Sequence, residues 1–237
     1  MYDLKIIYNK NIREITKRDI LKFIDLDLLK KINEENIYSS NLYKPKCFNE
    51  VKFPLDIEQT KKVLEGIQES NFNIAAKYNN EFKNIQHSII AEYMVNLFFA
   101  HKLKLTVTQF RKSCHTSMDI NLIPLFTAKG GSPDFDWYDE RKNIQYIIET
   151  TIHKTPNDVI KNESFTIMNH ATSVLGKNSQ NSKLKLFFIN FLNFKTEKLK
   201  NDVELAFNSL FDSFLKDIKN KILYKLSFKE LTYFNET

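Results

Sequence analysis

Two carboxylates on either side of a short polar segment are the residues of this sequence best suited to chemistry. Asp134 follows the residues Gly-Gly-Ser-Pro, and Glu149 stands 15 positions later inside an apolar run. A carboxylate in apolar surroundings is costly unless it is paired or bound to a metal. Mg²⁺ prefers hard oxygen ligands and is usually held by one or two protein carboxylates together with waters. The pair therefore predicts a magnesium site.

A β-hairpin is the element that would position these two carboxylates. Residues 134–138 and 143–152 have strand-forming sequences, and the polar residues 139–142 between them favour a short turn. The preceding residues, 129–133, predict another turn because Gly-Gly followed by Ser-Pro interrupts regular structure. Side chains alternate along a strand, so Glu149 and Thr151 are expected on one face.

The rest of the sequence predicts helices that cover a sheet. Expected helices span residues 20–28, which follow a capping box at 16–19, and residues 57–68, 82–102, 165–175 and 199–222; expected strands span 103–110 and 184–191, and a short strand and helix close the chain. This order predicts an α/β domain with a mixed β-sheet flanked by helices. We expect a mainly helical N-terminal region over residues 1–75 and the carboxylate-bearing domain over residues 76–237.

Composition and charge narrow the class of protein. The chain has 237 residues, 42% of them hydrophobic and 27% charged, which is ordinary for a globular protein. The formal charge of +6 favours a polyanionic partner such as nucleic acid. Cys47 and Cys114 form no CxxC pair, so a zinc site is not expected and both thiols are interpreted as reduced. Neither a signal peptide nor an apolar run of membrane-spanning length is seen, so we expect a cytoplasmic protein.

The carboxylate motif resembles that of a known family. Pro133-Asp134, a short strand and then Glu149-Thr150-Thr151 are similar to the signature of PD-(D/E)XK nucleases. Thr151 stands where that family most often carries a lysine, which helps to polarise the attacking water. Glu-x-Thr followed by an apolar residue resembles the type IIS restriction endonucleases of the AlwI and MlyI group.

Further residues extend the resemblance over about half of the chain, residues 82–194. Glu163 and His170, seven residues apart, resemble a downstream pair of the AlwI and MlyI group. Glu92 matches a helical glutamate of FokI-like cleavage domains, which also carry an apolar strand after the motif.

The resemblance implies a restriction-endonuclease-like fold and a bacterial Mg²⁺-dependent endonuclease that hydrolyses double-stranded DNA, with Mn²⁺ able to substitute. It implies that Asp134 and Glu149 hold the metal and that Thr151 and Glu92 belong to the catalytic site. One site cuts one strand, so double-strand cleavage implies a homodimer, a heterologous recognition or nicking subunit, or sequential nicking. Residues 1–75 then either read DNA or dock a partner.

Several assignments stay open at this stage. Asp136 is an alternative third metal ligand, and either His153 or Lys154 is an alternative to the missing motif lysine. Candidate DNA-binding residues are Lys102, Lys104, Arg111, Lys112, Lys154 and His170, and a second lysine-rich stretch covers residues 177–200. The alternatives in function are a repair or recombination nuclease of the same fold and a non-catalytic DNA-binding subunit with a decayed site.

Overall fold

The computed structural model describes residues 51–175, 183–192, 196–218 and 220–235. The chain divides into two units, residues 1–47 and residues 48–237, and every described residue belongs to the second. The helix expected over residues 20–28 and Cys47 therefore lie outside the described residues. That residues 1–75 read DNA or dock a partner stays a prediction.

A four-stranded mixed sheet forms the centre of this unit. Its strands lie in the order β3, β4, β5 and β6; β3 pairs with β4 antiparallel, and the other pairs are parallel. The bounds are Phe135–Asp139 for β3, Ile144–Thr150 for β4, Lys183–Asn190 for β5 and Lys221–Ser227 for β6. Parallel strands need crossover connections, and helices supply them, so the carboxyl ends of β4, β5 and β6 meet at one edge of the sheet.

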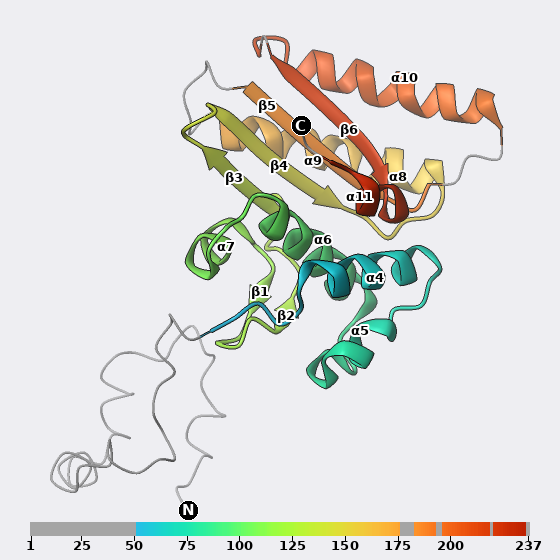
Figure 1. The fold of residues 1–237 in the computed structure, drawn as a ribbon. Helices are drawn as coiled ribbons and strands as arrows, with labels where there is room; N and C mark the ends of the chain where they lie inside the picture. The colour runs from blue at the N-terminus through green and yellow to red at the C-terminus, as the bar shows by residue number, and fades with distance from the viewer. Residues whose placement is uncertain (1–50, 176–182, 193–195, 219, 236–237) are drawn as a thin grey trace, which may run out of the picture. The chain divides into compact units, whose positions relative to one another are not determined.

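Helices cover both faces of the sheet, as Figure 1 shows. Because side chains alternate along a strand, Ile148 and Phe187 join one core and Ile147 and Phe188 join the other. The first core contains α4 (Ile57–Gln68), α6 (His87–Lys102) and α11 (Phe228–Tyr233), and the second contains α8 (Pro156–Asn162), α9 (Ser164–Leu175) and α10 (Glu197–Phe214). The predicted mixed sheet flanked by helices is confirmed.

Smaller elements complete the unit. The smaller elements are α5 (Ile74–Tyr78), the 3₁₀ helix η4 (Asn80–Phe82), α7 (Val107–Ser113), β1 (Ser117–Met118) and β2 (Pro124–Phe126).

Helix α4 packs against α6 and α11. The Phe228 N–H donates to Gln68 Oε1 at 3.1 Å, and Thr232 Oγ1 donates to Glu65 Oε1 at 3.3 Å. No helix in the described part of the chain combines the length and apolarity needed to cross a membrane.

The strand predicted over residues 103–110 is wrong, because α7 begins inside that range. Thr106 and Gln109 form a capping box in which each side chain accepts a hydrogen bond from the other's backbone N–H. This arrangement satisfies donors that a helix start leaves open. Leu105 and Phe110 are both buried, and a short apolar pattern does not distinguish a strand from a helix.

Several element boundaries also differ from the prediction. Helix α6 begins at His87 because residues 80–82 form η4, and α10 ends at Phe214. The residues after α10 lead into β6, whose Lys221–Ser227 segment pairs with β5. Helix α8 was not predicted, although Thr155 caps it and Pro156 stands in its first turn. The helix over residues 57–68, the one near 165–175 and the β3–β4 hairpin are confirmed.

Candidate functional site

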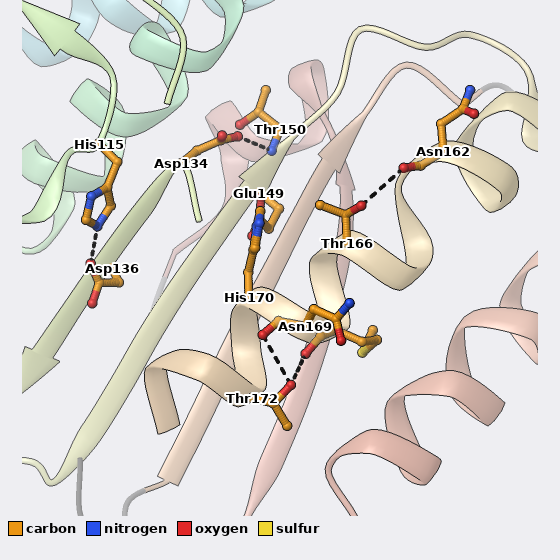
Figure 2. Close-up of polar contacts among 11 residues, drawn as sticks. His115, Asp134, Asp136, Glu149, Thr150, Asn162, Thr166, Asn169, His170 and Thr172 are labelled. Carbon is orange, nitrogen blue, oxygen red and sulfur yellow. Dashed lines mark hydrogen bonds and ion pairs between the residues drawn. The ribbon is translucent and has the colours of Figure 1, made fainter. Parts of the chain in front are cut away.

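Asp134 and Glu149 lie opposite each other at the open end of the β3–β4 hairpin (Figure 2). The register pairs Phe135 with Ile148, and one step further along it places Asp134 beside Glu149 on the same face. The Thr150 N–H donates to Asp134 Oδ2 at 2.7 Å. Gly131, with φ of +89°, makes the turn that leads into β3. Hairpin pairing thus brings together two residues that stand 15 positions apart.

Helix α6 fixes the first of these carboxylates through the backbone. Asn96 Nδ2 donates to the Asp134 carbonyl at 3.1 Å and to Thr116 Oγ1 at 3.0 Å. One turn earlier, Glu92 Oε1 accepts hydrogen bonds from Thr116 Oγ1 at 2.6 Å and from the Ala128 N–H at 2.7 Å. The helical glutamate is therefore buried and tied to the loop before Asp134. Asn96, Thr116 and Ala128 are site residues that sequence reasoning missed.

Thr151 joins Glu163 to the end of β4. Thr151 is 4% exposed, and its Oγ1 donates to Glu163 Oε1 at 3.0 Å. The same carboxylate lies 3.5 Å from His153 Nε2. Lys154 is directed elsewhere, since its Nζ donates to Ser70 Oγ at 2.7 Å and lies over the Phe191 ring. The motif-lysine position thus holds a hydroxyl that orients a further carboxylate.

His170 contacts Glu149 directly from α9. Its Nδ1 lies 2.8 Å from Glu149 Oε1, and Figure 2 shows the imidazole ring beside that carboxylate. Burial lowers the pKa of His170, while Glu163 acts in the opposite direction. The two side chains share one hydrogen bond, which links α9 to the end of β4. His170 therefore lies in the site, and its contact with DNA stays a prediction.

The electrostatics of the site are those of carboxylates without cationic partners. Burial, Glu149 and Glu92 raise the pKa of Asp134 well above its ordinary value. Burial, Glu163 and Glu92 do the same to the pKa of Glu149, and burial raises the pKa of Glu92. Asp134 and Glu149 are 9% and 6% exposed, and neither forms an ion pair with a lysine or arginine within the described residues.

A divalent cation fits this donor set. A cation between two buried carboxylates would offset their repulsion and lower both pKa values. Across the described residues, no group of three or more His, Cys, Asp or Glu side chains is arranged to hold a metal. Two carboxylates suffice for Mg²⁺, which keeps several waters and substrate oxygens as its other ligands.

Asp136, the alternative third ligand, has a partner of its own. Its Oδ1 lies 2.5 Å from His115 Nε2, further along β3 than Asp134 (Figure 2). The His115 N–H donates to the Asp134 carbonyl at 2.9 Å, so this histidine also helps to place the first carboxylate. Nothing in the sequence singles out His115, because it approaches β3 only through the tertiary fold.

The residues expected to bind DNA differ in their contacts within the protein. Lys102 donates to Asn235 Oδ1 at 3.2 Å, and Arg111 donates to the carbonyls of Asp119 and Ile120. Lys104 and Lys112 are exposed. The second lysine-rich stretch, residues 177–200, lies partly outside the described residues. A contact of these residues with DNA stays a prediction.

Comparison with known proteins finds likeness among solved structures. No family model matches the sequence, and no curated protein matches it. Among solved structures, the small subunit of the heterodimeric restriction endonuclease R.BspD6I is similar, with a TM-score of 0.41 and 12% sequence identity. The alignment covers 74% of this chain and 77% of that subunit. Similarity at this level assigns no chemistry, which has to be argued from the side chains of this chain.

Proposed function

We propose that this chain is a Mg²⁺-dependent endonuclease that hydrolyses phosphodiester bonds of double-stranded DNA. The observation that carries the proposal is the buried Asp134–Glu149 pair, which lacks a lysine or arginine partner among the described residues. Carboxylates buried without such a cation cost stability. Residues that destabilise the fold in this way are often functional. Carboxylates with shifted pKa values in a small cluster are typical of catalytic centres.

Asp134 and Glu149 would hold the ion, for which Mn²⁺ is expected to substitute. A bound divalent ion lowers the pKa of water and stabilises negative charge on a phosphoryl group. His170 orients Glu149 through the 2.8 Å contact, and Thr151 holds Glu163 through the 3.0 Å contact. Glu92, fixed on the Ala128 N–H, keeps the loop before Asp134 against α6.

The substrate class rests on charge and on the motif. A chain with a formal charge of +6 is suited to a polyanion, and the Pro133-Asp134 and Glu149-Thr150-Thr151 pattern resembles that of nucleases. We propose a type II or type IIS restriction endonuclease, or its catalytic subunit. One site cuts one strand, so cutting both strands calls for a second copy, a partner subunit or two successive nicks.

Cleavage of supercoiled plasmid tests the proposal. Wild type with Mg²⁺ or Mn²⁺ should convert the plasmid to nicked or linear DNA, and EDTA should prevent this. Asp134→Asn and Glu149→Gln should abolish the reaction. Glu140→Gln, an exposed carboxylate at the turn of the same hairpin, should leave it unchanged. Cleavage that survives both site variants would remove these residues from the site, and an inactive wild type would favour a DNA-binding subunit with a decayed site.

A further inference from the structure

A cleft of about 820 Å³ opens beside α5 and the first turn of α6. Its lining lies wholly within the described part of the chain and contains no aspartate or glutamate. Besides His87 and Ser88, its polar side chains are amides and lysines: Asn73, Lys77, Asn80, Lys83, Asn84 and Gln86. Asn84 adopts φ of +70°, a left-handed conformation that asparagine tolerates better than most residues.

These side chains are available to a ligand. The side chains of Lys77, Lys83 and Asn84 form no hydrogen bond or ion pair with any described residue, and all three residues are exposed. Lys102 and Lys154, which the sequence favoured for DNA contact, instead donate to side chains of the protein. The cleft therefore gathers positive charge and amide groups that the fold does not itself use.

The cleft adjoins the carboxylate site along two elements. Ile152, which lines it, stands three residues after Glu149, a separation of at most about 11 Å for an extended chain. Ile90, which also lines it, belongs to α6, the helix that carries Glu92. A DNA strand advances about 3.4 Å per nucleotide. A strand cut at the carboxylates would thus reach the cleft within about three nucleotides.

A series of ring contacts starts at His87, which lines the cleft. His87, in the first turn of α6, stacks on Phe72 with ring centroids 4.2 Å apart and an interplanar angle of 6°. Phe72 in turn contacts Phe191 at 6.3 Å, and Lys154 Nζ lies 5.3 Å from the Phe191 ring centroid. The segment that follows β4 is thereby tied to the start of α6. A surface held in place before binding loses less entropy when it binds.

We propose that this cleft binds the sugar–phosphate backbone of double-stranded DNA next to the scissile phosphate. Lys77 and Lys83 contact phosphates, and Asn84 with the neighbouring amides donates hydrogen bonds to phosphate and sugar oxygens, which are the usual partners of such side chains on DNA. The assignment rests on the proposed function for its substrate, although binding is measured without cleavage.

Fluorescence anisotropy of a labelled duplex of about 30 base pairs, titrated with the full chain in EDTA over a range of salt concentrations, tests the proposal. The double variant Lys77→Glu/Lys83→Glu should bind at least about tenfold more weakly at low salt. Its plot of log affinity against log salt should be shallower by about two, since each lost phosphate contact removes about 0.9. Lys142→Glu/Lys216→Glu makes the same change in charge at exposed lysines in the β3–β4 turn and after α10 and should bind like wild type.

Asn84→Asp provides a second variant that keeps size and backbone preference while it adds a negative charge, and it should also weaken binding. Equal weakening by both lysine pairs would overturn the proposal, as would a cleft variant that binds like wild type or a wild type that binds no duplex. Loss of binding confined to the cleft variants would support it. Cleavage that depends on Asp134 but not on the cleft would leave the proposed function standing without this surface.

Discussion

Replacing Asp134 with asparagine is expected to stabilise the metal-free protein while it abolishes cleavage. Burial and the neighbouring carboxylates raise the pKa of Asp134 well above its ordinary value. A group with a raised folded-state pKa contributes its full stability below its unfolded pKa, about 3.9, and loses that contribution as the pH rises through the folded pKa. As the pH rises the wild-type protein loses this contribution, whereas an asparagine never carries the charge.

The magnitude follows from two opposing effects. Each unit by which the pKa is raised costs about 1.4 kcal/mol above the folded pKa. Against this, the 2.7 Å hydrogen bond from the Thr150 N–H to Asp134 Oδ2 loses its charge, a change worth about 1 kcal/mol. Because burial and two neighbouring carboxylates all raise this pKa, the net change is expected to be a gain. For a chain of this size each kcal/mol of gain corresponds to a rise in Tm of about 2–4 °C.

Thermal unfolding in EDTA at pH 5 and pH 8, followed by titration with Mg²⁺, measures these effects. The difference between Asp134→Asn and wild type should be larger at pH 8. Mg²⁺ should then stabilise wild type by about 2.7 kcal/mol at one hundred times its Kd and leave the variant unchanged. Glu140→Gln should follow wild type throughout. A lower Tm for Asp134→Asn in EDTA at pH 8, or an equal response of both proteins to Mg²⁺, would refute the reasoning.

Three further substitutions follow from the contacts. His170→Gln should lower cleavage by about 10- to 100-fold and weaken metal binding in calorimetry, because partners of metal ligands have effects of this size. Thr151→Val keeps its shape but loses the contact with Glu163, so cleavage should fall by about tenfold with little change in Tm. Tyr93→Phe removes a buried 2.5 Å hydrogen bond to the Leu122 carbonyl and should cost about 1–3 kcal/mol in urea unfolding; an unchanged midpoint would contradict this.

The hairpin that carries the carboxylates could be read from the sequence because its information is local. Two strand-forming runs, a polar turn and alternation of side chains are enough to place Asp134 near Glu149. Glu92 was identified by resemblance rather than by pattern. Asn96 and His115 were not identified, since both reach Asp134 through contacts between elements far apart in the chain.

The errors in secondary structure have a similar origin. The apolar residues near Leu105 suit either a strand or a helix, and the capping box at Thr106 decided for α7. The apolar residues near Ile222 continued the pattern of α10, but pairing with β5 made them part of β6. Local propensity differs little between such states, so tertiary partners determine the outcome.

The contact between α4 and α11 joins two segments that are synthesised at different times. Gln68 and Phe228 are joined by a hydrogen bond across 160 positions. At about 5–20 residues per second, synthesis of that interval takes roughly 10–30 s. Asp134, Glu149 and β5 are all made within this interval, while α4 is still without α11 and β5 without β6. The residues of the carboxylate site, which end at His170, are thus made before the strand and helix that complete the sheet and the core beside it.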